Sequence, residues 1–118
     1  MNCSCDENTI LCTEGTTLNL YFNFNENISV FDKAVFVVRK NADSIPVITK
    51  TITELKEDSA EVELSPTDTS KFVFDNNKNQ ATYIWGLDLL GGTTRINVFP
   101  KTGESAPLFV VYKHIAEE

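Results

Sequence analysis

Apolar and polar positions alternate along much of this chain. Within residues 17–25, every second residue from Leu18 to Phe24 is apolar, and most of their neighbours are polar. This period of two is typical of a β-strand that buries one face. Residues 60–64 repeat the pattern with alternating apolar residues and glutamates. The pattern therefore predicts two strands that each turn one face toward a core.

Five further segments are also predicted to be strands. Residues 34–39 have β-branched or aromatic side chains on both faces of the predicted strand, which predicts a central strand covered on both sides. Residues 45–52 contain Pro46, whose missing N–H favours an edge strand or the start of a strand. The other three strands are expected at about residues 83–90, 93–99 and 108–112.

Turn-forming residues separate these segments. Ser65 followed by Pro66 is typical of a helix N-cap and first helical residue, but no 3.6-residue apolar pattern follows. We therefore expect a single helical turn that ends near Phe72. Gly91 and Gly92 are expected to supply the positive φ values of a two-residue hairpin. The predicted fold is all-β: an immunoglobulin-like antiparallel β-sandwich of about seven strands with at most one short helical turn.

The length and composition agree with one domain of this kind. The chain has 118 residues, of which 42% are hydrophobic and 23% charged. These values are ordinary for a globular domain, and domains cluster near ~100–150 residues. We expect residues 1–13 to form a flexible N-terminal arm and residues 14–115 to form a single β-sandwich domain.

The charge balance excludes some classes of partner. Seventeen Asp and Glu residues outnumber ten Lys and Arg residues, so the formal net charge is −7. A nucleic-acid-binding surface needs a cationic excess, and an anionic membrane surface repels an acidic chain. No apolar stretch approaches the ~20 residues of a membrane-spanning helix, and the N-terminus lacks the pattern of a secretory signal. We expect neither nucleic acid nor a membrane as partner, and a protein made in the cytosol.

All three cysteines, Cys3, Cys5 and Cys12, fall within the first 12 residues. One interpretation is a thiolate metal site, but structural zinc usually has four ligands, and His114 lies at the far end of the chain. We favour free thiols on an exposed arm, and expect no metal and no cofactor. Replacing all three by serine is then expected to change stability by less than ~0.5 kcal/mol.

The sequence carries none of the common catalytic motifs. It lacks a G-x-S-x-G elbow, an H-E-x-x-H pair, a phosphate-binding glycine loop and a D-x-D-x-D-G calcium loop. Cys12 with His114 is a formal nucleophile pair, but nothing in the sequence orients the base. Glu61 and Glu63 are expected on the solvent side of their strand. We therefore expect no catalytic residue and no enzymatic activity.

Aromatic and charged residues within the strands are the remaining candidates. Trp85 shares a strand face with Leu87, which predicts core packing, and Asp88 is expected to pair with Arg95 across the hairpin. Tyr21 and Tyr112 are the expected interface residues. An amphipathic ring buries apolar area while keeping a polar tip in water, which suits this role.

Four short motifs follow one another in the order of a known family. They are Gly15-Thr16-Thr17, Ala34-Val35-Phe36-Val37-Val38-Arg39-Lys40, Val62-Glu63-Leu64-Ser65-Pro66-Thr67-Asp68-Thr69 and Tyr83-Ile84-Trp85-Gly86-Leu87-Asp88-Leu89. The succession resembles the N-terminal domain of phage baseplate upper proteins and related small prophage tail-associated proteins, across residues 15–112. Members show a G-D-T opening, a T-V-x-F-x-V-R-K strand, an L-T-P-x-D-T turn and a Y-x-Y-D-I strand.

The resemblance implies a non-enzymatic structural or attachment module of a phage or prophage tail or baseplate. Its partners would be other phage structural proteins or copies of itself in a homo-oligomer. Its location would be the virion, after assembly in the bacterial cytoplasm. The alternative, drawn from the exposed aromatic residues, is a carbohydrate-binding or adhesin-like β-sandwich that recognises a cell-surface glycan.

Overall fold

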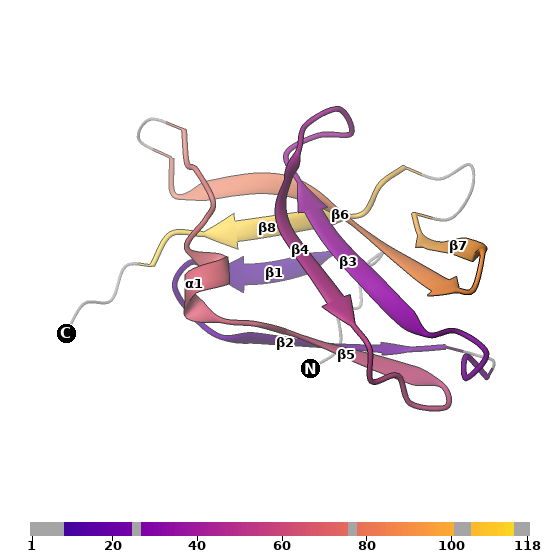
Figure 1. Cartoon of the computed structure of the whole chain (residues 1–118). Helices are drawn as coiled ribbons and strands as arrows, with labels where there is room; N and C mark the ends of the chain where they lie inside the picture. Colours follow the sequence, from indigo (N-terminus) through magenta and orange to yellow (C-terminus); the bar gives the residue numbers. More distant parts are fainter. Residues whose placement is uncertain (1–8, 25–26, 76–77, 101–104, 115–118) are drawn as a thin grey trace.

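The computed structural model describes residues 9–24, 27–75, 78–100 and 105–114. Within these residues the chain forms eight strands and one four-residue helix (Figure 1). No helix in this part of the chain is long and apolar enough to cross a membrane. The elements, in chain order, are β1 (Ile10–Thr13), β2 (Leu18–Asn23), β3 (Lys33–Arg39), β4 (Pro46–Ile52), β5 (Ser59–Leu64), α1 (Pro66–Thr69), β6 (Gln80–Gly91), β7 (Thr94–Phe99) and β8 (Leu108–Tyr112).

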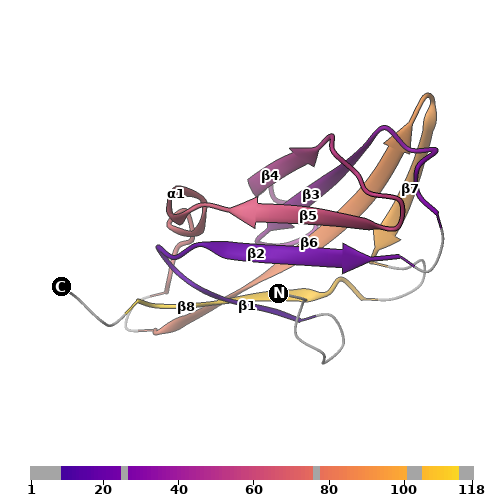
Figure 2. The same cartoon turned by 90° about the horizontal axis from the view of Figure 1, so that it is seen from below.

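The strands form two facing sheets. The larger sheet has the order β1-β8-β6-β3-β4, with β7 also paired to β6, and the smaller sheet is the antiparallel pair β2-β5. Figure 2 shows β2 and β5 side by side in a layer of their own. The pair β2 and β5 is thus separated from the neighbouring strands β3, β6 and β8. An immunoglobulin-like sandwich separates its B and E strands from its C, F and G strands in the same way. The all-β prediction is confirmed.

β1 lies where the flexible arm was expected. It pairs in parallel with β8, and its residues Ile10 and Cys12 are 1% and 4% exposed. The predicted arm is therefore wrong for Ile10–Thr13, and the sandwich is not antiparallel throughout; residues 1–8 lie outside the described residues. The physical reason is that two apolar side chains enter the core while the backbone completes the edge of β8.

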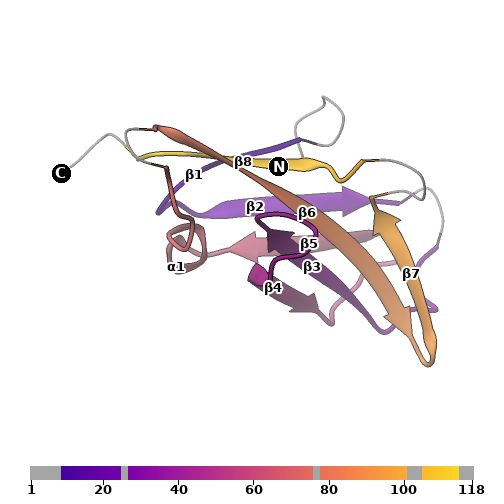
Figure 3. The ribbon, with the colours of Figure 1, turned by 90° about the horizontal axis from the view of Figure 1, so that it is seen from above.

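β7 and β8 occupy the same edge of β6, one after the other (Figure 3). The chain leaves this edge after Phe99 and has returned by Pro107, whose carbonyl accepts a hydrogen bond from the Trp85 N–H at 3.1 Å. Gly86 lies at this break, where an added Cβ would come within 3.1 Å of the Phe99 carbonyl oxygen. The long strand β6 thus supports two shorter partners, and glycine permits the close approach.

The hairpin between β6 and β7 differs in detail from its prediction. Gly91 still pairs with Thr94, so the turn falls on Gly92 and the residue after it, and only Gly92 has a positive φ, of 59°. Gly91 has a different role, because a Cβ there would lie 2.9 Å from the Val30 carbonyl oxygen. Gly92 is therefore suited to the positive φ of the turn, and Gly91 to the close approach of the Val30 backbone.

An aromatic cluster joins the two sheets. Phe22 of the small sheet packs against Phe36 and Trp85 of the large sheet, with ring centroids 6.0 and 5.5 Å apart. The predicted core position of Trp85 is confirmed. β3 is central in hydrogen bonding, but the prediction that both of its faces are covered is wrong: Val35 and Val37 are only half-buried, and no element of the described chain lies over them.

The helical turn α1 starts as predicted. Ser65 is the N-cap and Pro66 the first helical residue, and a reciprocal capping box links Ser65 with Asp68. The Asp68 N–H donates to Ser65 Oγ at 3.2 Å, and the Ser65 N–H donates to Asp68 Oδ2 at 2.9 Å. The turn ends at Thr69, before the predicted end near Phe72.

Candidate functional site

The described residues do not form a metal-binding cluster. No group of three His, Cys, Asp or Glu side chains lies close enough to hold a metal within the part of the chain that the structure describes. Burial raises the pKa of Cys12 to about 11, so this sulfur is a neutral thiol inside the core, whereas His114 is exposed. The exposed-thiol interpretation is wrong for Cys12. Cys3 and Cys5 lie outside the described residues.

Two surfaces of the sandwich have no covering element among the described residues, and the first is a groove beside β5. A cavity of about 460 Å³ is continued by one of about 250 Å³ that shares Ile52, Glu54 and Glu63 with it. We call the two together the β5 groove. Its remaining lining residues come from β2, β4, the β4–β5 connection and β5: Tyr21, Lys50, Thr51, Thr53, Leu55, Lys56, Ser59, Ala60, Glu61 and Val62.

The groove exists because β5 has a neighbouring strand on one edge only. β5 pairs with β2 and with no other strand of the described chain. The connection from β4 to β5 is residues 53–58, all of them described, and it contains no strand. Six residues are too few for another strand with its two turns, since strands alone average about 5–6 residues. The second edge of β5 therefore pairs with no strand of the described chain, and the β5 groove lies between this edge and β4.

The polar lining of the β5 groove is mostly acidic. Tyr21 stands opposite Glu61 in the strand register, and a hydrogen bond to the Glu61 carboxylate raises the pKa of Tyr21. The negative charges of Glu61 and Glu63 act in the same direction, so the phenol stays neutral. Glu54, Glu61 and Glu63 form no ion pair within the described residues.

One end of the groove is closed by an ion pair. Lys50, on β4, places its Nζ 2.8 Å from Asp68 Oδ2 of α1. The hydrogen bond from Lys50, together with two hydrogen bonds from Ser65, lowers the pKa of Asp68 to about 2 against the opposing effect of burial. Lys50 is thus engaged with the helical turn, and Lys56 is the other cation in the lining.

The second surface is the side of the large sheet that faces away from β2 and β5, which we call the outer face. Its exposed apolar residues are Leu11, Leu108 and Tyr112, at 48%, 43% and 40% exposure. Leu11 stands beside Val110, and Leu108 stands beside Ile84, in adjacent strands. Apolar side chains therefore lie next to one another from Leu11 of β1 through β8 to Ile84 of β6, and the β3 neighbour of Ile84 is Arg39.

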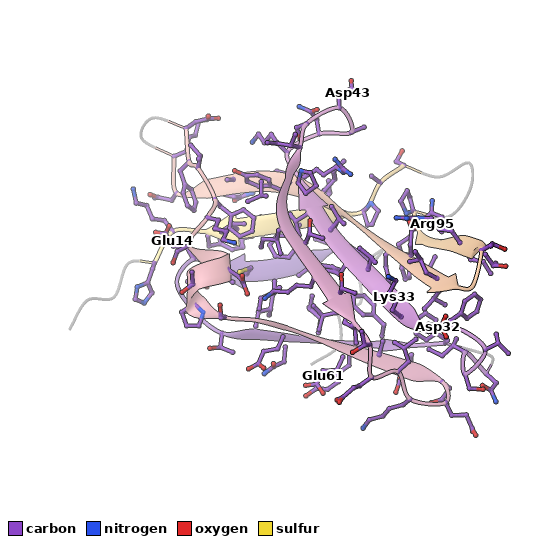
Figure 4. The ribbon with its side chains drawn as sticks, in the orientation of Figure 1. Glu14, Asp32, Lys33, Asp43, Glu61 and Arg95 are labelled. Carbon is purple, nitrogen blue, oxygen red and sulfur yellow. The ribbon has the colours of Figure 1, made fainter. Side chains whose placement is uncertain are left out.

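Two charged groups at the margin of the outer face form an ion pair. Arg95 Nε donates to Asp88 Oδ2 at 2.6 Å, which confirms the predicted pair across the hairpin. The Arg39 guanidinium donates to the Ser44 carbonyl at 2.7 Å and keeps its positive charge. Figure 4 shows Arg95 on β7, at the far end of this sheet from Glu14. The outer face thus presents apolar area with one ion pair at its margin.

The structure separates the two predicted interface residues. Tyr21 belongs to the β5 groove and Tyr112 to the outer face, so they lie on opposite sides of the sandwich. Both are exposed, and their role in an interface stays a prediction. Sequence reasoning missed Leu55, a partly buried residue of the β4–β5 connection. An apolar side chain within Glu54–Asp58 was the available signal.

Comparisons with known proteins add little beyond the fold. No family model matches this chain, and no curated protein matches it either. Among solved structures, it is similar to a strand-swapped dimer of the extracellular domain of mouse leukocyte-associated immunoglobulin-like receptor 1. The identity is 12%, the TM-score is 0.48, and the match covers 98% of this chain and 90% of that one. A similarity this distant says nothing about what this chain binds.

Proposed function

We propose that this protein is a non-enzymatic structural or attachment module that acts through protein–protein assembly, in the tail or baseplate of a phage or prophage. The observation that carries the proposal is the apolar outer face. An apolar patch on a protein surface is often a functional interface. Leu11, Leu108 and Tyr112 form its exposed part, and the Asp88–Arg95 pair at its margin carries no net charge.

The phage context of this proposal is supported by the resemblance of the sequence motifs. A sandwich with well-packed inner faces and one apolar outer face suits a repeated building block, because identical copies or neighbouring subunits can bury that face. Its partners are then copies of this chain or other structural proteins of the particle. The particle would be its site of action, with no cofactor and no bond-making chemistry.

A glycan-binding role is the alternative, and Tyr21 is the observation in its favour. Its ring is exposed within a concave site that also holds the Glu61 and Glu63 carboxylates. Aromatic rings and carboxylates together can stack on a sugar and accept its hydroxyl hydrogen bonds. A glycan array tests this role directly, and a Tyr21→Ala variant is its control.

The assembly role is tested by placing a charge on the outer face. Leu108→Glu should convert an oligomer of the wild-type chain to a monomer, measured by light scattering after size-exclusion chromatography. It should also reduce incorporation of the tagged chain into purified particles. Ile45→Glu is the matched control, because Ile45 is 84% exposed on the β3–β4 loop and should not change either measurement. Unchanged assembly of the Leu108→Glu variant would contradict the proposal.

A further inference from the structure

We propose that the β5 groove binds an extended, basic segment of another protein, which adds to the free edge of β5 as a further strand. This inference does not depend on the outer face or on the phage assignment. It rests on three properties of the groove: a strand edge without a partner strand, an apolar floor, and a rim of carboxylates that form no ion pair within the described part of the chain.

The backbone of β5 provides the first property. In an antiparallel pair, alternate residues direct their N–H and C=O groups away from the partner strand. β5 has β2 on one side only, so alternate residues of Ser59–Leu64 present such groups toward the cavity, where the Ser59 carbonyl already accepts a hydrogen bond from the Lys56 N–H at 3.0 Å. An incoming strand at the usual spacing of about 4.8 Å pairs with these groups and extends the small sheet by one strand. Main-chain hydrogen bonds of this kind give affinity without requiring one particular sequence.

Side chains along the groove then select the segment. Its floor includes Ile52, Leu55 and Ala60, which offer apolar contacts. Its rim carries Glu54 and Glu61, together with Glu63. Among the described residues, Lys56 is the one cation that lines the larger cavity, and it forms no ion pair with them. A strand that alternates apolar residues with Lys or Arg places one set on the floor and the other on the rim, because strand side chains alternate between faces.

The charge balance favours a different protein over a second copy as the occupant. Each copy carries a formal charge of −7, so two copies repel one another when an acidic groove is brought against an acidic chain. Strand edges are often guarded by charges that prevent unselective pairing. Here the carboxylates of the rim have one sign, so they repel acidic segments and attract basic ones. Lys50 does not offset them, because it is engaged with Asp68.

The test uses a synthetic peptide of alternating lysine and valine, capped at both ends, titrated into the ¹⁵N-labelled full-length protein. We expect the amide resonances of residues 52–64 and of Tyr21 to shift, with those of the outer face unchanged. The same peptide N-methylated at alternate residues cannot complete the ladder and should bind at least about tenfold more weakly. A peptide with glutamate in place of lysine should not bind.

Variants that remove the same charge at different positions distinguish binding at the groove from an effect of net charge. Glu61→Gln should weaken binding about two- to fivefold at low salt, and the double variant with Glu63→Gln about three- to tenfold. Asp43→Asn is the control, because Asp43 lies at the tip of the β3–β4 loop, far from Glu61 beside β5 (Figure 4). Both side chains are exposed, so the variants should fold like the wild type.

Three results would overturn the inference. One is equal binding of the N-methylated and unmodified peptides, which would indicate charge attraction without strand pairing. Another is an equal loss of affinity for Glu61→Gln and Asp43→Asn, which would indicate a response to net charge alone. The third is a set of resonance shifts confined to Tyr21 on addition of a glycan, with none on addition of the peptide. The Leu108→Glu experiment on the outer face is independent of all three outcomes.

Discussion

The β5 groove and the outer face are both uncovered, but their chemistry differs. The groove is concave, lies against the small sheet and gathers Glu54, Glu61 and Glu63 without ion pairs in the described residues. The outer face spans strands of the large sheet, exposes Leu11 and Leu108, and has its Asp88 carboxylate already paired. The same sandwich thus divides its charge and its apolar area between opposite sides.

This division changes how the acidic composition is understood. A formal charge of −7 spread evenly would keep the whole surface soluble and unselective. Instead, part of the negative charge lies beside the free edge of β5, where it selects a basic partner. The outer face exposes apolar residues, which permits apolar contact there. Tyr21 and Tyr112 were predicted for one reason, yet the structure places one in each setting.

The largest expected effect comes from the core that both surfaces share. Phe36 is fully buried, and its ring lies 6.0 Å from Phe22 of the small sheet and 5.8 Å from Trp85. Phe36→Ala should lower the free energy of unfolding by about 3–5 kcal/mol, measured by urea denaturation. Binding at the two surfaces should then be lost together. Val30→Ala, at a side chain 78% exposed, should change stability by less than about 0.5 kcal/mol.

The next effect separates the large sheet from the groove. Cys12 is buried, and its thiol lies 3.6 Å from the Thr13 carbonyl oxygen, too far for a strong hydrogen bond from a serine hydroxyl. Cys12→Ser should therefore cost about 1–3 kcal/mol, in place of the negligible change expected for an exposed arm. Hydrogen exchange should speed up in β1 and β8 before it does in β5.

Leu11→Ser is the control for Cys12→Ser, because Leu11 precedes it in β1 and points to the solvent side. It should cost less than about 1 kcal/mol. Equal costs for the two variants would show that β1 does not bury one face as the structure has it.

The contrast between β1 and the other strands shows what the sequence can predict. The sequence alone identifies the period-two segments within residues 17–25 and 83–90, and also the Ser65 cap and the Asp88–Arg95 pair, which are local. β1 has four residues, and its partner β8 lies at the other end of the chain. So short an alternation is indistinguishable from an arm until the partner strand is known.

The two surfaces were harder to predict than the strands. The β5 groove results from the absence of a strand beside β5, and no residue pattern marks an absence. The outer face depends on which side of β3 packs against the small sheet. The sequence does not decide this, because β3 has apolar residues on both of its faces. Sheet order decides both features, and it arises from long-range pairing that local periodicity does not specify.

Acid should affect the α1 end of the β5 groove and leave the outer face unchanged. The pKa of Asp68 falls from 3.8 to about 2 through the hydrogen bond from Lys50. A carboxyl whose pKa is lower in the folded state stabilises the fold above pH 3.8, and this contribution is lost as pH falls toward 2. We expect a loss of about 1–2 kcal/mol over this window, measured by chemical denaturation at each pH.

The Asp68→Asn variant separates this carboxyl from the others. It should be less stable than the wild type at neutral pH and should show a smaller loss of stability on acidification between pH 3.8 and 2. Asp43→Asn, at an exposed loop, should retain the wild-type dependence. An unchanged acid dependence in the Asp68→Asn variant would show that Lys50 does not stabilise the folded carboxylate.

The smallest effect is expected for the charges at the margin of the outer face. Asp88 and Arg95 form a close pair, but the Arg95 side chain is 60% exposed, so water and salt screen the attraction. Asp88→Asn should therefore change stability by about 0.2–1 kcal/mol, and less at high salt. If assembly depends on apolar contact at the outer face, Asp88→Asn should leave the oligomer intact where Leu108→Glu dissociates it. Loss of the oligomer in both variants would instead show that the ion pair is part of the interface, so that charged as well as apolar contacts hold the oligomer together.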